Sequence, residues 1–181
     1  MLLGLQAGAH QLPFIPVIGF LGTDYMKIRD DFKVVKDPYS GEDYVVVPPI
    51  IPDVAVIHGL KGDRSGGVTV LGARNDRLLA TAARKTIAVV EELVEPGEVL
   101  PGLQEVYVAP VHIDAVVVAP GGAHPTECPG RYEIDAGHIM TYLTAAKDEA
   151  SFQNYLETYI TGPADHEAYL KKVGFRTPDA T

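Results

Sequence analysis

Uninterrupted apolar runs that stop at glycine or proline are the feature that most constrains the fold of this chain. Residues 112–119 read HIDAVVVA and stop at a Pro-Gly-Gly turn, and residues 53–58 read DVAVIH and stop at a glycine-rich stretch. Strands that are covered on both faces give such runs, whereas strands with one wet face alternate apolar and polar residues. The sequence therefore predicts an α/β protein with an open, mostly parallel sheet and helices on both faces.

Weaker patterns complete the predicted element order. Further strands are expected at residues 44–47, 68–71 and 86–90, helices at residues 1–11 and from 75 or 76 to about 85, and a polar glycine-rich loop at residues 59–67. After about Asp135 large apolar residues recur at helical spacing, which predicts two or three helices with a buried face. No linker or repeat interrupts the pattern, so we expect one domain over residues 1–181.

Charge and composition exclude several classes of partner. The net charge of −9 disfavours nucleic-acid binding, because that binding depends on Lys and Arg neutralising phosphates. No apolar run approaches the roughly 20 residues that cross a bilayer, so we expect no membrane contact. The single cysteine, Cys128, rules out an internal disulfide and suits a reducing cytoplasm. With no basic neighbour before Arg131, this cysteine is interpreted as structural.

The loop after the predicted strand at 112–119 is the most informative local stretch. It reads GGAHP, and its glycines allow the backbone to approach a ligand or to turn sharply. Because ligands of α/β proteins bind at the carboxyl ends of strands, Gly122 and His124 are candidate binding residues. His124 would donate to a carboxylate or thioester oxygen, and a plain strand-exit turn is the equally weighted alternative.

Other candidate motifs are incomplete. None of the six histidines shows metal-ligand spacing with another, so no metal is expected. Glu91 and Glu92 are adjacent on a predicted strand and would point to opposite faces, so they do not predict an acid–base pair. The acidic residues near the predicted helix starts are explained by the helix dipole. Residue patterns alone thus predict an α/β domain with a ligand edge and no complete catalytic set.

Five stretches, taken in order, resemble a known family. They are GLQAGAHQLPFIPVIGFLGTD at the start, VVVPPIIPDVAVIHG, ATAARKTIAVVEE, HIDAVVVAPGGAHPTECPGRYEID, and the C-terminal helices with Phe152, Tyr159, His166 and Tyr169-Leu170. Together they are similar to the α subunit of family I CoA-transferases of the glutaconate CoA-transferase type. The resemblance covers nearly the whole chain. It implies a CoA-transferase (NagB/RpiA-like) fold that is incomplete at the N-terminus, because the N-terminal third of that α subunit has no counterpart here.

The resemblance also implies a function. Family enzymes move CoA between an acyl-CoA thioester and a carboxylic acid, of the glutaconate or 3-oxoacid type, by attack of a glutamate that lies on a partner β subunit. No catalytic residue is therefore expected in this chain, no cofactor is bound, and the CoA thioester is a substrate. The resemblance implies an α2β2 assembly. It also implies that substrate is contacted by Gly22, Thr23, Asp24, Gly122 and His124, where backbone N–H groups would hold a carboxylate or an oxyanion.

Three other readings remain open at this point. The same scaffold resembles a steroid-ring hydrolase subunit that acts on a CoA thioester, and also a glutaconyl-type CoA decarboxylase. A reading of a different class is a non-catalytic chain that only binds a partner. The partner's residue at the glutamate position would discriminate among them.

Overall fold

The computed structural model describes residues 2–72 and 74–176, which fall into two compact units. Unit 1 comprises Met1–Val89 and Leu93–Val117, and unit 2 comprises Val90–Glu92 and Val118–Thr181. Met1, the expected start of the first helix, lies outside the described residues. The mixture of sheets and helices confirms the predicted α/β class, and the single domain over 1–181 stays a prediction.

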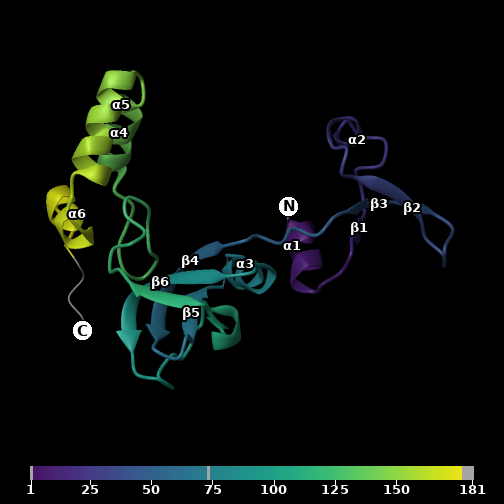
Figure 1. Ribbon diagram of the computed structural model, residues 1–181, viewed down its shortest axis with the longest axis horizontal. Coiled ribbons are helices and arrows are strands. Elements are labelled where there is room, and N and C mark those ends of the chain that lie inside the picture. The colour runs from purple at the N-terminus through teal and green to yellow at the C-terminus, as the bar shows by residue number, and fades with distance from the viewer. Residues whose placement is uncertain (1, 73, 177–181) are drawn as a thin grey trace. The chain divides into compact units, whose positions relative to one another are not determined.

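A small antiparallel sheet with its own core forms the N-terminal part of unit 1 (Figure 1). Its strand order is β1-β3-β2, and α2 precedes β2 in the chain. The bounds are β1 Ile15–Val17, α2 Tyr25–Ile28, β2 Lys33–Lys36 and β3 Asp43–Val47. Val17, Val45 and Val47 are buried here, with Phe20 and Phe32 packed against them. Of these elements the sequence pattern predicted only β3, because β1 and β2 are short and β1 contains a proline.

Helix α1, Leu2–Ala9, confirms the first predicted helix and packs against α3, Asp76–Ala82. Its two glycines, Gly4 and Gly8, are buried and face the chain at Ile50. The Ile50 N–H donates to the Gly4 carbonyl at 2.8 Å, and a Cβ on Gly8 would collide with the Ile50 carbonyl. The segment that follows β3 can therefore lie directly against the helix backbone because both positions lack a side chain.

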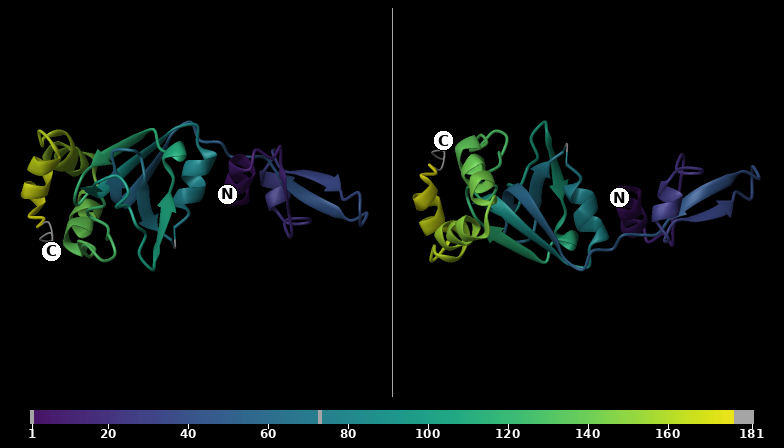
Figure 2. Two further views of the ribbon diagram at one scale, coloured as in Figure 1. Left: turned by 90° about the horizontal axis from the view of Figure 1, so that it is seen from below. Right: turned by 90° about the horizontal axis from the view of Figure 1, so that it is seen from above.

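The larger sheet has the strand order β7-β5-β4-β6-β8 (Figures 1 and 2). The bounds are β4 Ala55–Asp63, β5 Val68–Leu71, β6 Thr86–Val94, β7 Glu105–Val108 and β8 Ala115–Val118. The pairings of β5 with β4 and with β7 are antiparallel, so this side of the sheet differs from the mostly parallel arrangement that was expected. The reason is that a short hairpin turn, rather than a crossover helix, joins β4 to β5.

The predicted loop at residues 59–67 is wrong in its first half. Strand β4 continues to Asp63, because Lys61 and Gly62 pair with Thr69 and Val68 of β5. Glycines in this strand hid the signal, since a glycine weakens a strand pattern without preventing backbone pairing. Only residues 64–67 form the turn, and the Asp63 carboxylate accepts hydrogen bonds inside it.

Boundaries of three other elements differ from the prediction. The strand expected at residues 112–119 is shorter, because Pro110–His112 forms a 3-10 turn and β8 begins at Ala115. Strand β6 runs four residues further than expected, to Val94. Helix α3 ends at Ala82, where Ala83 takes an extended conformation.

Unit 2 contains the predicted C-terminal helices. They are α4 Ala136–Ala145, α5 Glu149–Leu156, the π-helical turn Glu157–Thr161 and α6 His166–Val173. Each α-helix of this unit is preceded by an aspartate whose carboxylate accepts an N–H of the first helical turn. These capping residues are Asp135, Asp148 and Asp165. No helix in the described part of the chain is long and apolar enough to cross a membrane.

Candidate functional site

The loop after β8 is closed by its own backbone hydrogen bonds. The Gly122 N–H donates to the Ala119 carbonyl at 2.9 Å, and the His124 N–H donates to the Gly121 carbonyl at 3.0 Å. Gly121 has a positive φ of 73°, which a glycine adopts without strain. Two of the N–H groups that the sequence offered as oxyanion donors are thus occupied within the loop.

Glu91 of β6 holds the same loop in place. One carboxylate oxygen accepts the Gly121 N–H at 2.7 Å, and the other accepts the Tyr132 hydroxyl at 2.5 Å. Tyr132 in turn accepts the Ala123 N–H at 2.9 Å. Burial and the hydrogen bond to Glu91 raise the pKa of Tyr132 above its usual range. Glu91 is only 8% exposed, so this carboxylate is a structural anchor for the loop rather than a group open to solvent.

The neighbouring carboxylate has a different environment. Glu92 accepts a hydrogen bond from Arg131 at 2.6 Å, and its side chain is 43% exposed. The expectation that Glu91 and Glu92 point to opposite faces of their strand is confirmed, because one is buried and the other lies at the surface.

The His124 side chain is buried and bonded at both ring nitrogens. Nδ1 lies 2.7 Å from the Tyr169 hydroxyl, and Nε2 lies 3.2 Å from Oδ2 of Asp135. Asp135 also accepts the His138 N–H at 2.8 Å through Oδ1, which caps α4. The backbone N–H of His138 and the ring of His124 hold the pKa of Asp135 below its usual value. The His124 side chain is 4% exposed, and its two hydrogen bonds connect Asp135 at the start of α4 with Tyr169 of α6.

A second histidine extends this cluster. His138 lies with its ring centroid 5.1 Å from that of His124, and its Nε2 is 2.8 Å from the Tyr155 hydroxyl. Tyr159 packs against His138 edge to face at 4.8 Å. Burial, together with repulsion from a charged His124, lowers the pKa of His138. These surroundings therefore favour the neutral form of His138.

An open cavity of about 420 Å³ lies beside the loop. It is lined by Gly121, Gly122, His124, Tyr159, Ile160, Pro163, Asp165, His166 and Tyr169. Two lining side chains are engaged elsewhere: Asp165 accepts the Ala168 N–H at 2.8 Å, and His166 is hydrogen-bonded to the Pro120 carbonyl at 2.8 Å. Two of the five predicted substrate residues, Gly122 and His124, thus meet at one concave surface.

The other three predicted substrate residues belong to unit 1, in the turn before α2. Thr23 donates to the Phe20 carbonyl through its N–H at 3.0 Å and through its hydroxyl at 2.6 Å. Asp24 forms an exposed ion pair with Lys27 at 2.8 Å. Within residues 2–72 and 74–176, the Gly22 N–H has no hydrogen-bond partner. The five residues thus belong to two different units, and their role in substrate binding stays a prediction.

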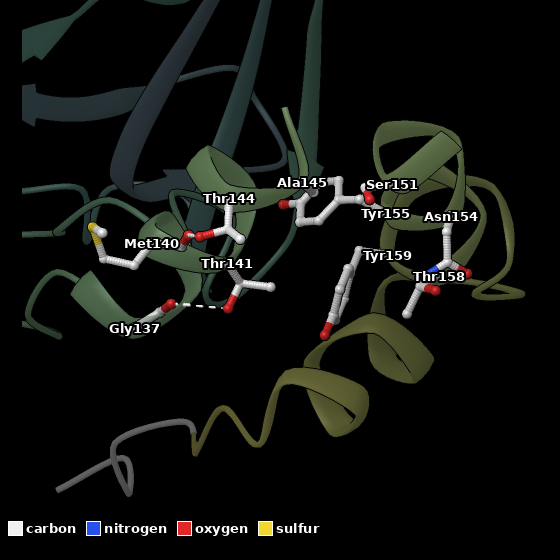
Figure 3. A pocket seen from close by; sticks show the side chains of 10 residues that line it. All are labelled: Gly137, Met140, Thr141, Thr144, Ala145, Ser151, Asn154, Tyr155, Thr158 and Tyr159. Atoms are coloured by element: carbon white, nitrogen blue, oxygen red, sulfur yellow. Dashed lines mark hydrogen bonds between the residues drawn. The ribbon is translucent and has the colours of Figure 1, made fainter. Parts of the chain in front are cut away.

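A separate groove lies on the face of α4 and α5 in unit 2, with a volume of about 550 Å³ (Figure 3). It is lined by Gly137, Met140, Thr141, Thr144, Ala145, Ser151, Asn154, Tyr155, Thr158 and Tyr159. The hydroxyls of Thr141 and Thr144 donate to carbonyls of their own helix. None of these lining residues is charged, so the groove offers no strong site for an ionic ligand.

The sequence did not predict the roles of four residues that hold the loop and His124 in place, namely Glu91, Tyr132, Asp135 and Tyr169. One signal was present for Glu91, since an acidic residue inside an apolar strand needs buried partners. An aspartate just before a predicted helix indicates a capping residue, which explains Oδ1 of Asp135 but does not predict that Oδ2 faces His124. The pairing of residues 45 positions apart, as for His124 and Tyr169, leaves no pattern in a single sequence.

Comparison with known proteins places this chain in a family. The sequence model of the family described as coenzyme A transferase matches residues 1–119. This chain belongs to the coenzyme A transferase family. Its likeness to that family extends beyond the matched residues, because alignments with individual members reach over the helices of unit 2 as well.

Three relatives illustrate the range of the family. The A subunit of the 3-oxoadipate CoA-transferase of Pseudomonas knackmussii is 32% identical over 92% of this chain and 59% of its own length. The cholesterol ring-cleaving hydrolase IpdA subunit of Rhodococcus jostii is also 32% identical, over 93% of this chain and 61% of its own length. The crystal structure of glutaconate coenzyme A-transferase from Acidaminococcus fermentans superposes with a TM-score of 0.86 at 30% identity.

That superposition covers 96% of this chain and 60% of the solved one, so the expected CoA-transferase fold is confirmed. The chain spans about three-fifths of the length of these three relatives.

Proposed function

We propose that this chain is the α subunit of a two-subunit enzyme that transfers CoA between an acyl-CoA thioester and a carboxylic acid. The observation that carries the proposal is the likeness to glutaconate coenzyme A-transferase, with a TM-score of 0.86 over 96% of the chain. The similarity to one subunit of a 3-oxoadipate CoA-transferase supports the same reaction class. The partner is a β subunit in a proposed α2β2 assembly in the cytoplasm, the CoA thioester is a substrate, and no cofactor takes part.

In the proposed reaction the attacking carboxylate comes from the partner. A glutamate carboxylate attacks the thioester carbonyl, the C–S bond breaks, and CoA leaves as a thiolate, which gives a mixed anhydride between the acyl group and the glutamate. The thiolate then attacks the glutamyl carbonyl, which releases the first carboxylic acid and leaves an enzyme thioester. The second carboxylic acid reverses these two steps and leaves with CoA. The loop-anchoring carboxylate of this chain, Glu91, does not suit this role, because both of its oxygens accept hydrogen bonds.

The five predicted substrate residues supply binding in this proposal. Gly122 and His124 form one wall of the open cavity in unit 2. The Gly22 turn in unit 1 supplies a backbone N–H with no partner among the described residues, and such a donor can hold a carboxylate or a developing oxyanion. Thr23 and Asp24 complete that turn. We propose the turn, rather than the closed loop at Gly122, as the backbone donor.

The first test is transfer by the complex. The chain is co-expressed with the β-like subunit encoded beside it, and CoA exchange between a dicarboxylic acyl-CoA and acetate is assayed. We expect exchange that disappears when the partner's nucleophilic glutamate is changed to glutamine. A stable complex that consumes a CoA ester without needing an acceptor acid would contradict the transferase proposal.

A hydrolase is the second candidate, and the similarity to the ring-cleaving hydrolase subunit favours it. The two reactions differ in the second substrate: a transferase needs a carboxylic acid that accepts CoA, whereas a hydrolase uses water. Omitting acetate from the assay separates them, because a transferase then stops after one turnover while a hydrolase continues. Assembly of a complex that neither exchanges nor consumes a CoA ester would support the non-catalytic alternative.

The Gly22 turn is tested by a matched pair of variants. Gly22→Ala places a side chain at a φ of 77°, and Gly19→Ala does the same at a φ of 106° in the same turn, where a Cβ would meet no atom at either position. Both changes strain the backbone, but only the first alters the proposed donor. We expect exchange by the complex to fall at least about tenfold for Gly22→Ala relative to Gly19→Ala, by analogy with oxyanion-hole donors. Equal losses in both variants would argue against this role.

A further inference from the structure

We propose that Asp135 is a positioning residue, which acts through His124 to hold the Gly122 side of the unit 2 cavity in its binding shape. This inference rests on the proposed function only in taking that cavity as a substrate site. In this proposal His124 supports the cavity wall and does not donate a hydrogen bond to substrate. The argument follows from the partners of each ring atom and from the burial of the ring.

The first step is that His124 has no ring nitrogen left for a ligand. Nε2 faces an Asp135 oxygen at 3.2 Å and Nδ1 faces the Tyr169 hydroxyl at 2.7 Å, while the side chain is 4% exposed. A neutral imidazole has one donor and one acceptor, and both are already paired here. The ring therefore contributes to the cavity through its position rather than through a hydrogen bond to substrate.

The second step is that the Asp135 carboxylate selects the tautomer. An ionised carboxylate only accepts hydrogen bonds, so Nε2 of His124 carries the proton. Nδ1 is then the acceptor, and the Tyr169 hydroxyl donates to it. One carboxylate thus determines the direction of both hydrogen bonds of the ring.

The third step is that this one residue connects the loop to two helices. The Asp135 N–H donates to the Pro125 carbonyl at 2.9 Å, at the end of the loop, while Oδ1 caps α4 through the His138 N–H. Through His124 the same side chain reaches Tyr169 on α6, which also lines the cavity. If the Asp135 side chain is lost, the backbone bond to Pro125 remains, but His124 loses its Nε2 partner and α4 loses its cap, so that Gly122 and Tyr169 can shift within the cavity wall.

The experiment uses the complex of the chain with its β subunit. Asp135→Ala removes the cap and the His124 contact, and Asp148→Ala removes the cap of α5 alone, because Asp148 accepts the Ser151 N–H at 2.9 Å and does not contact His124. We expect Asp135→Ala to raise KM for the acyl-CoA about tenfold with kcat changed less than about threefold, since a small displacement of binding groups weakens positioning. Asp148→Ala should lower the melting temperature similarly and leave KM unchanged. A KM for Asp135→Ala that equals the Asp148→Ala value would overturn the proposal.

A second readout is independent of turnover. Nitrogen-15 NMR of the His124 ring in the complex should show the Nε2–H tautomer in the wild type. In Asp135→Asn the amide can still cap α4 through its oxygen, but its NH₂ faces Nε2, so the ring should switch to the Nδ1–H tautomer. An Nδ1–H tautomer in the wild type, or no switch in Asp135→Asn, would overturn the inference.

Binding of acetyl-CoA by calorimetry separates this inference from the proposed function. A complex that shows no exchange but binds acetyl-CoA about tenfold more weakly after Asp135→Ala would refute the transferase proposal and uphold the positioning role. A wild-type complex that does not bind acetyl-CoA would overturn both.

Discussion

Several buried polar side chains of this chain are hydrogen-bonded within small groups. Asp63 is 3% exposed, and its Oδ1 accepts the Ser65 N–H at 2.8 Å, the Ser65 hydroxyl at 2.6 Å and the Gly67 N–H at 3.1 Å. His138 is 8% exposed and is bonded to Tyr155. Because a buried group that loses its partner keeps its desolvation cost, single changes at such positions should have large effects.

Asp63→Ala should destabilise the chain by about 1–3 kcal/mol, because the buried Gly67 N–H is left without an acceptor. The comparable change in the exposed β2–β3 turn, Asp37→Ala, removes similar contacts to Tyr39 and Ser40 but leaves water in their place. We expect it to cost about 0.5 kcal/mol or less. Urea unfolding of both variants measures the difference, and equal losses would contradict the role of burial.

His138 should make stability depend on pH. Its pKa is lowered by burial and by repulsion from His124, whereas in the unfolded chain it lies near 6.5. Below about pH 6.5 the unfolded chain therefore binds more protons than the folded one, so the free energy of unfolding falls as the pH drops below that value and is fully retained above it.

His138→Gln should remove part of this decline. Denaturation at about pH 7.5, 6.5 and 5.5 gives the slope for the wild type, for His138→Gln and for His10→Gln, a change at an exposed histidine. The His10→Gln slope should match the wild type. An unchanged slope in His138→Gln would show that this residue is not the source.

At the scale of elements, helix α1 and the segment at Ile50 approach each other closely in unit 1. Helix α1 presents Gly4 and Gly8 to the chain at Ile50, and it also packs against α3 and β1. An exposed helix would gain stability from alanine at these positions, by up to about 1 kcal/mol each. The packing here reverses that preference at Gly8, since the obstacle is a backbone carbonyl that cannot rotate away.

Gly8→Ala should therefore destabilise the chain by about 1–3 kcal/mol, the usual cost of overpacking. Gly4→Ala is the matched control, because the nearest atoms to its Cβ belong to the Ile50 side chain, which can change rotamer. We expect a smaller loss there, or none. Thermal unfolding ranks the two variants, and a stabilised Gly8→Ala would show that the helix does not lie against Ile50 in solution.

At the scale of the whole molecule, strand β8 has an unusual environment. It lies at the edge of the five-stranded sheet, and Val117 is 46% exposed although the sequence reads as a buried run. An exposed apolar edge strand is a template for pairing with another chain.

Val117→Lys should reduce self-association of the chain when it is expressed without a partner, because a charged side chain on an edge strand disfavours pairing. Val111→Lys is the control, since Val111 is 83% exposed but lies outside the strand. Light scattering over a range of concentrations gives the apparent mass of each. Equal behaviour of the two variants would exclude β8 as the associating surface.

Local patterns were sufficient for the elements that carry strong periodicity. Helix α1, strand β5 and the C-terminal helices, of which two or three were expected, follow from apolar spacing and from turn residues, which act within a few positions of the chain. The open cavity beside Gly122 and His124 was anticipated because strand ends are common ligand sites. The family resemblance, carried by five stretches in order, is confirmed by the match over residues 1–119.

Only the tertiary structure decided what these residues do to one another. The extension of β4 depends on pairing with β5, and the position of His124 depends on Tyr169, 45 residues away. Such contacts join segments that are distant in the chain, so no local spacing encodes them. The sequence by itself determined the helices and strands with strong periodicity, because propensity and periodicity are local. The fold decided which side chains are buried and paired, because burial is a property of all neighbours in space.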